Sequence, residues 1–125
     1  MRIGELAART GVSVRALRYY EEQELLVAER SHSGQRQYPE SAVDHVRLIQ
    51  RLYAAGLSSR TIVELMPYAV DGRATPELLD RLSTERDRVE GRITALVGTR
   101  DRLDSVITGA TSNLDTGRPC RAGTS

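Results

Sequence analysis

Two arginines and two tyrosines near the start of the chain stand at spacings that suit contact with a nucleic acid. Arg15 and Arg18 are about one helical turn apart, and Tyr19 and Tyr20 follow directly. Arginine presents a planar fork of donors that matches phosphate oxygens and the edge of guanine. Because base contacts concentrate at the start of a recognition helix, we expect Arg15 to reach bases or phosphates, and Arg18 and Tyr19 to touch phosphates beside the groove.

The surrounding residues predict the two helices that such a reader needs. Ile3, Leu6 and Ala7 at helical spacing indicate a first helix, and Gly11 suits the left-handed position that ends it. Ser13 is a suitable N-cap for a second helix over about 14–23. Leu17 and one of the two tyrosines are expected to face inward, which leaves both arginines outside.

A small hairpin, or wing, is predicted to follow the second helix. Leu25–Val27 is apolar and partly β-branched, Arg36–Tyr38 alternates in polarity, and the segment between them is rich in turn residues with Gly34 near its tip. A wing in this position would contact the DNA backbone that flanks the groove. The wing side chains expected to do so are Arg30, Gln35 and Arg36.

Two more helices are expected to complete the first domain. Pro39 opens a helix over about 39–55, Gly56 ends it, and Ser58 caps a fourth helix over about 59–66. We expect a winged helix-turn-helix domain over residues 1–70. Its predicted DNA contacts are Ser13, Arg15, Arg18, Tyr19, Tyr20, Arg30, Gln35, Arg36, Tyr38, Ser58 and Arg60.

A long helix is predicted to follow a linker over 71–75. From 76 to 110 the apolar residues keep a heptad, and a lone helix of this kind cannot bury its own apolar seam. The simplest partner is a second copy of the chain. The seam positions are Leu79, Leu82, Arg86, Val89, Ile93, Leu96, Arg100, Leu103 and Ile107. The fold class is therefore all-α with a small β wing, followed by a dimerisation helix, and a flexible tail is expected over 111–125.

Arg86 and Arg100 interrupt the seam, and two interpretations stay open. Their stems can pack while their charged ends reach solvent. Alternatively they fix the register of the coiled coil by pairing across the seam, since unpaired charges there are costly. The acidic residues within reach of such pairing are Glu85, Asp87, Glu90 and Asp101.

The composition and the motifs of the chain argue against several classes of protein. The 125 residues carry a net charge of +1, with arginine as the sole basic residue apart from two histidines. One cysteine, Cys120, excludes a disulfide within the chain, and no apolar run is long enough for a membrane span or a signal peptide. No paired-carboxylate, Ser/His/Asp or phosphate-loop pattern indicates an enzyme. We expect a cytoplasmic protein without catalytic activity.

The first 65 or so residues resemble the DNA-binding domain of the MerR family of transcriptional regulators. The opening motif of that family is matched by Ile3, Glu5, Ala7, Gly11, Val12, Ser13, Leu17, Arg18, Tyr19, Tyr20 and Glu21. The wing signature is matched by Arg36, Gln37 and Tyr38, and the next helix pair by Leu48, Leu52, Gly56, Leu57, Ser58 and Ile62. One departure is Glu24, where many members have glycine, so a strained turn is expected there.

The resemblance implies how such a protein would act. Members of this family are homodimers whose long helices pair antiparallel, which agrees with the heptad. The dimer places two winged helices on a palindromic promoter operator, then bends and untwists the DNA for RNA polymerase. Sequence-dependent deformability would then supply part of the specificity.

The effector is not indicated. Metal-sensing members use cysteines around the dimer helix, whereas this chain has Cys120 alone, and one thiolate cannot build a metal site, so no metal or cofactor is expected. Cys120 is interpreted as an ordinary thiol, with a redox role or a disulfide between two chains as the alternatives. His32 and His45 are expected on the surface. A small molecule bound near Tyr53, Met66 and Tyr68 stays open, as do a purely structural role for these residues and the absence of any effector.

Two other functions are considered. An architectural protein that bends DNA without responding to a signal would use the same N-terminal reader. A coiled-coil adaptor that binds protein through its wing leaves Arg15, Arg18 and Arg36 unexplained. Whether bound DNA recruits polymerase would separate the regulator from the architectural protein.

Overall fold

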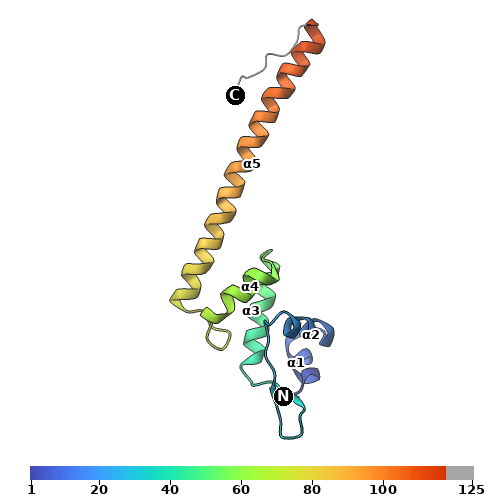
Figure 1. Cartoon of the computed structure of the whole chain (residues 1–125), viewed down its shortest axis with the longest axis vertical. Coiled ribbons are helices and arrows are strands. Elements are labelled where there is room, and N and C mark those ends of the chain that lie inside the picture. Colours follow the sequence, from blue (N-terminus) through green and yellow to red (C-terminus); the bar gives the residue numbers. More distant parts are fainter. Residues whose placement is uncertain (118–125) are drawn as a thin grey trace. The chain divides into compact units, whose positions relative to one another are not determined.

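The computed structural model describes residues 1–117 and contains five α-helices, one short 3-10 helix and a two-stranded sheet in that range (Figure 1). Cys120 lies outside the described residues. The chain divides into two compact units, Met1–Leu82 and Ser83–Ser125. The first unit holds the predicted winged helix-turn-helix.

Helices α1 (Ile3–Thr10) and α2 (Val14–Glu22) form where the sequence predicts them. Gly11 takes a φ of 72° and donates its N–H to the carbonyl of Ala7, which ends α1. The Ser13 hydroxyl accepts a hydrogen bond from the N–H of Ala16, so it is the expected N-cap of α2. These two local signals set the turn of the helix-turn-helix.

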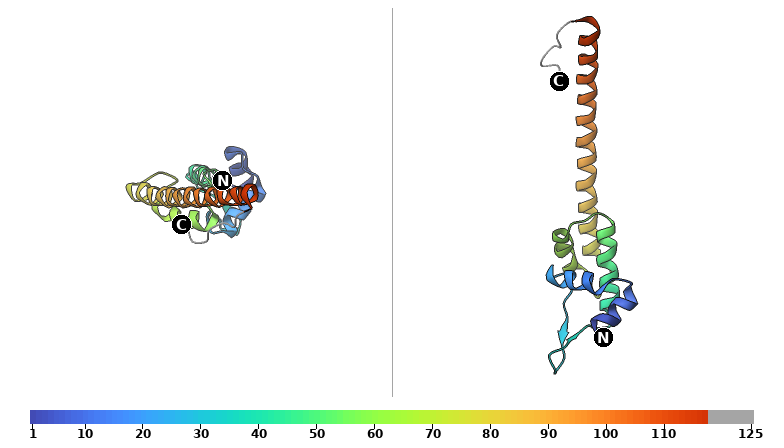
Figure 2. Two further views of the ribbon diagram at one scale, coloured as in Figure 1. Left: turned by 90° about the horizontal axis from the view of Figure 1, so that it is seen from above. Right: turned by 90° about the vertical axis from the view of Figure 1, so that its right-hand side faces the viewer.

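The wing is an antiparallel pair, β1 (Glu29–Arg30) and β2 (Arg36–Gln37), that projects from the helices (Figures 1 and 2). Gly34 lies at its tip with a φ of 81°. The prediction of a strand at Leu25–Val27 is wrong, because Leu25 and Leu26 are buried in the core. Burying two adjacent apolar side chains outweighs strand pairing there, so the hairpin begins further along the chain.

Helix α3 spans Ala42–Ala54, so the prediction that Pro39 opens it is wrong. Tyr38 donates its N–H to the carbonyl of Met1, and the N-terminal amino group of Met1 donates to the carbonyl of Tyr38. This pairing holds the chain extended before Pro39, and the carbonyl of Pro39 then accepts the N–H of Ala42 in a turn. The helix can begin only after that turn.

Helix α4 (Ser59–Leu65) and the 3-10 helix η1 (Met66–Tyr68) follow, with Ser58 as the predicted N-cap of α4. The predicted linker over 71–75 contains an ordered turn, in which Val70 pairs with Arg73. Gly72 sits so close to the start of α3 that a Cβ atom there would lie 2.4 Å from the carbonyl carbon of Asp44. This turn is therefore docked on α3.

One hydrophobic core holds the first unit together. It gathers apolar side chains from α1, α2, α3 and α4 and from the segments around the wing. The most completely buried side chains of the first unit are Leu6, Leu17, Leu25, Tyr38, Val46, Ile49, Ile62 and Leu78. Leu78 belongs to the first turn of α5, so the base of the long helix is part of this unit.

Helix α5 spans Pro76–Thr116, six residues beyond the predicted end at 110. It ends at Gly117, which has a φ of 70° and donates its N–H to the carbonyl of Asn113. The prediction of a flexible tail from 111 is therefore wrong for 111–116, where polar residues and Leu114 continue the helix up to Gly117. Across the described chain, no helix is both long enough and apolar enough to cross a membrane.

Candidate nucleic-acid interface

Helix α2 has one buried face and one exposed face. Leu17 and Tyr20 are buried, whereas Arg15, Arg18 and Tyr19 are exposed. The exposed face has a shallow hollow lined by Val14, Arg15, Arg18, Tyr19 and Glu22. The sequence left open which tyrosine faces inward, and the structure assigns Tyr20 to the core and Tyr19 to the surface.

Arg15 and Arg18 are free cations within the described part of the chain. Neither guanidinium has a hydrogen bond or an ion pair to any described residue. Most other exposed arginines of this unit have a partner: Arg9 pairs with Glu40, for example, and lowers the pKa of that carboxyl. Two unpaired arginines about one turn apart can donate hydrogen bonds to phosphate oxygens without breaking an internal bond.

A hydroxyl cluster fixes the position of α2 against α4. The hydroxyl of Tyr19 lies 3.2 Å from Oγ of Ser59, and the hydroxyl of Tyr53 bonds to the same oxygen. The rings of Tyr20 and Tyr53 stack with centroids 5.7 Å apart. Sequence reasoning missed Ser59, because nothing in a serine beside the N-cap Ser58 signals a contact with a tyrosine so far along the chain.

Two of the predicted DNA contacts are buried. Tyr20 is 8% exposed and Tyr38 is 2% exposed, so the structure corrects their role from contact residues to packing residues. Each has a large aromatic ring, and burying that ring in the core removes much apolar surface from water. Ser13 and Ser58 each cap a helix, and Arg60 is exposed on α4, with Glu64 4.0 Å away.

The wing is attached to α2 through Glu21. One carboxylate oxygen of Glu21 accepts the hydroxyl of Tyr38, and the other lies 3.2 Å from Nη1 of Arg36. At the wing tip, Nη1 of Arg30 donates to the carbonyl of Gly34, and Gln35 accepts a bond from Arg2. Arg30 and Arg36 thus shape the wing in the free protein, in addition to the DNA contact predicted for them.

His45 is half-buried rather than on the surface, and its Nε2 lies 2.7 Å from the carbonyl oxygen of Leu25. This bond joins α3 to the segment after α2, which explains why the expected surface position is wrong. His32 is exposed near the wing tip, as predicted. Among the described residues, no three side chains of the metal-ligating types form a cluster.

The sequence of this winged unit matches a known family. A family profile described as "MerR HTH family regulatory protein" matches residues 1–69, more than half of the chain. The chain belongs to the MerR family. The resemblance stated from the sequence motifs is therefore confirmed, and with it the fold class of a winged helix-turn-helix followed by a long helix.

Curated relatives extend the match beyond the MerR domain. The nodulation protein NolA of Bradyrhizobium elkanii is 38% identical over 110 residues, covering 87% of this chain and 48% of NolA. The HTH-type transcriptional regulator HmrR of Rhizobium leguminosarum bv. viciae is 30% identical over 108 residues, covering 86% of this chain and 84% of HmrR. The chain spans about half the length of the NolA proteins that it matches.

Solved MerR structures share the fold. A MerR family transcriptional regulator from Listeria monocytogenes superposes with a TM-score of 0.59 at 26% identity, covering 94% of this chain and 90% of its own. HiNmlR, described as a MerR family regulator lacking the sensor domain and bound to promoter DNA, superposes with a TM-score of 0.54 at 22% identity, over 93% of this chain and 94% of HiNmlR.

Proposed function

We propose that this MerR-family protein is a sequence-specific DNA-binding transcriptional regulator that acts as a homodimer on a palindromic promoter operator. The observation that carries the proposal is the exposed face of α2, where Arg15 and Arg18 stand without a partner among the described residues. The relatives named as transcriptional regulators, and the fold shared with a promoter-bound regulator, support it.

The DNA contacts fall into two groups by geometry. Arg15 in the first turn of α2 is the candidate for reading base edges, and Arg18 and Tyr19 are candidates for phosphate contacts that fix the register of the helix in the groove. The remaining contacts are proposed to come from the N-cap of α2, from the wing and from the start of α4. They are assigned to Ser13, Arg30, Gln35, Arg36, Ser58 and Arg60.

The dimer is supported by the apolar stripe on α5. Within one chain Leu79, Ile93 and Ile107 are each about half exposed or more, although they recur at one heptad position. Leu114, brought into the helix by its longer extent, occupies the same position and is 84% exposed. A second copy of the helix would cover this stripe, and an antiparallel pairing is proposed from the family.

The seam differs from the predicted one at its beginning. Leu82 packs partly against the core of the first unit, and Leu78, which is not a seam residue, is buried there. Further along, Arg86 pairs with Asp87 and Glu90 of its own helix, and Arg100 pairs with Asp101. We therefore propose that Leu79 and the seam residues from Val89 onward carry the coiled coil.

The mode of action is proposed from the family. Two winged units on a two-fold symmetric site would bend and untwist the promoter and so change how RNA polymerase engages it. The protein would work in the cytoplasm, where the promoter and the polymerase are.

The test is a selection of bound sequences from a random duplex pool with the full chain at near-physiological salt. We expect enrichment of a two-fold symmetric site with half-sites at a fixed spacing. The Arg15→Ala/Arg18→Ala variant should enrich nothing. The matched control is Arg88→Ala/Arg102→Ala, which removes the same charge from two exposed positions on the outer side of α5 and should enrich the wild-type site.

Two outcomes would contradict the proposal. Enrichment of flexible or AT-rich DNA without a symmetric site would indicate an architectural DNA-bending protein. Equal loss of enrichment in both double variants would show that total charge, rather than the face of α2, carries the binding.

A further inference from the structure

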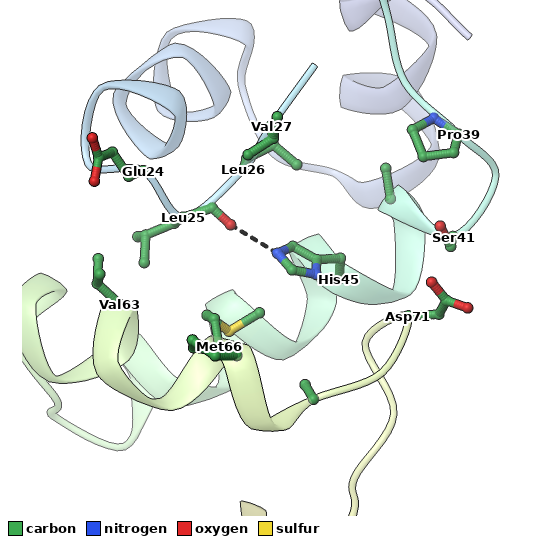
Figure 3. Close-up of a pocket in the computed structure, with 13 residues that line it drawn as sticks. Glu24, Leu25, Leu26, Val27, Pro39, Ser41, His45, Val63, Met66 and Asp71 are labelled. Atoms are coloured by element: carbon green, nitrogen blue, oxygen red, sulfur yellow. Dashed lines mark hydrogen bonds between the residues drawn. The ribbon is translucent and has the colours of Figure 1, made fainter. Parts of the chain in front are cut away.

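A pocket of about 460 Å³ lies within the first unit, on the segment that follows α2 (Figure 3). This volume falls in the range of small-molecule sites. Its walls are mainly apolar. The lining residues come from the segment after α2, from the segment before α3, from α3, α4 and η1, and from the start of the docked turn. The main apolar contributors are Leu25, Leu26, Val63, Met66, Pro67 and Ala69.

The charged side chains of the pocket are two carboxylates. Glu24 and Asp71 lie at opposite ends, with Leu25, His45 and Met66 between them (Figure 3). No arginine is among the described residues that line it. Although arginines slightly outnumber acidic residues in the whole chain, this lining would repel an anion and attract a cation.

Backbone strain marks the same two residues. Glu24 has a φ of 62° and Asp71 a φ of 50°, and they are the two non-glycine residues with positive φ in the described chain. A side chain in this conformation costs on the order of 1 kcal/mol, which glycine avoids. Asp71 and Gly72 form the two-residue turn between Val70 and Arg73, where aspartate tolerates a positive φ, and Glu24 stands at the left-handed turn that follows α2. Both residues line the same pocket.

We propose that this pocket binds a small organic cation, with an apolar body against Leu25 and Met66 and an ammonium group at Glu24 or Asp71. The apolar body would be held by burial, and the ammonium by a charge-assisted hydrogen bond to a carboxylate. Among the residues that line the pocket, Glu24 and Asp71 are the acidic ones, so a charge-assisted hydrogen bond from an ammonium would go to one of them.

The pocket joins two parts of the first unit that regulation would need to connect. Its residues 24–27 lead from α2 into the wing, and Asp71 belongs to the turn that Gly72 docks on α3 just before α5 begins. A ligand that bridges them would change the DNA affinity of the wing and helix together. This regulatory consequence rests on the proposed function, whereas binding of the cation does not.

The experiment measures binding to the free, full-length protein by calorimetry and by amide chemical shifts. The probes are 2-phenylethylammonium, its neutral counterpart 2-phenylethanol and its anionic counterpart 3-phenylpropanoate. We expect the ammonium to bind about tenfold or more tightly than the alcohol, with shifts centred on residues 24–27 and 63–71, and the anion not to bind.

Matched substitutions separate the two carboxylates. Glu24→Gln and Asp71→Asn keep size and backbone preference, and their combination should remove the advantage of the ammonium over the alcohol. Glu5→Gln, on the exposed surface of α1 outside the pocket, should keep it. Equal binding of ammonium and alcohol to the wild type, shifts away from the pocket, or no binding of the ammonium would each overturn the proposal. Because no DNA is present, these outcomes are independent of the proposed DNA binding.

Discussion

Glu21 joins the recognition helix to the wing: its Oε2 lies 3.2 Å from Nη1 of Arg36 on β2. The other oxygen of the same carboxylate accepts the hydroxyl of Tyr38. The Glu21 side chain is 15% exposed and that of Arg36 is 48% exposed, so the pair is partly shielded from solvent. The angle of the wing relative to α2 therefore depends on one acidic side chain at the end of that helix.

A double-mutant cycle should detect this attachment. We expect Glu21→Gln and Arg36→Gln each to lower the free energy of unfolding, with a coupling energy of about 0.5–1 kcal/mol between them. Urea unfolding of the wild type, both single variants and the double variant gives the coupling. The pair Arg60 and Glu64, more exposed and 4.0 Å apart, is the matched control and should show less coupling. Strictly additive effects of the first pair would contradict its structural role.

Arg18→Ala should weaken binding to every DNA sequence and make it less dependent on salt. If Arg18 contacts one phosphate, the slope of log affinity against log salt should fall by about 0.9. Fluorescence anisotropy over a salt series measures the slope. Arg18→Lys keeps the positive charge and should therefore keep most of the wild-type slope. A change of preference at a single base pair, with an unchanged slope, would assign Arg18 to base reading instead.

Ile93→Asp should abolish the dimer without unfolding the first unit. Ile93 is 49% exposed in the single chain and lies at a proposed seam position. A charge there should therefore destabilise the pairing of two helices more than the folding of one chain. Sedimentation should show a monomer. Thr94→Asp introduces the same charge one residue away, off the seam, and should stay dimeric. A dimer that survives Ile93→Asp would contradict the proposed seam.

Truncation should separate the contribution of α5 to the core of the first unit from its proposed role in dimerisation. A chain ending at Leu82 keeps the buried Leu78 and should fold as a monomer that binds one half-site weakly. A chain ending at Thr75 lacks Leu78, and losing a buried leucine costs about 2–5 kcal/mol. Circular dichroism and thermal unfolding compare the two. Equal stability would show that the base of α5 does not support the core.

Glu24→Gly should leave the first unit as stable as the wild type or raise its free energy of unfolding by up to about 1 kcal/mol. Glycine adopts the φ of 62° found there without the steric penalty of a side chain, although it gains more entropy on unfolding. Glu22→Gly, the same change inside α2, should instead lower stability by about 0.5–1 kcal/mol. Chemical unfolding measures both, and a clear loss of stability in Glu24→Gly would mean that Glu24 makes contacts worth more than the strain.

Stability should decline at alkaline pH because of Tyr20. Burial, with a smaller effect of Tyr53, raises the pKa of Tyr20 above its usual value in the folded chain. The unfolded chain then loses the phenol proton first, so stability is retained below about pH 10 and lost as the pH rises towards the folded pKa. Unfolding titrations across this window should show the decline, and Tyr20→Phe, which keeps the stacked ring, should reduce it. An unchanged decline in that variant would assign the effect to another group.

Local signals in the sequence determined where the helix-turn-helix begins and turns. Gly11, Ser13 and Ser58 act through hydrogen bonds and dihedral angles within a few residues, so their roles as helix stop and N-caps follow from residue type and spacing alone. The unusual Glu24 was likewise visible, since an L-residue stands where the backbone must turn left-handed. The family follows from the same short-range pattern.

The tertiary structure alone decided the long-range pairings. Met1 hydrogen-bonds to Tyr38, so α3 begins later than predicted. Leu25 and Leu26 are buried in the core and do not form a strand. Ser59 contacts the hydroxyls of two tyrosines from other helices. Each of these contacts depends on which distant segments pack against each other, and the spacing of residues along the chain does not specify that. For the same reason the pocket between Glu24 and Asp71 becomes visible only when α2, α4 and the docked turn are packed together.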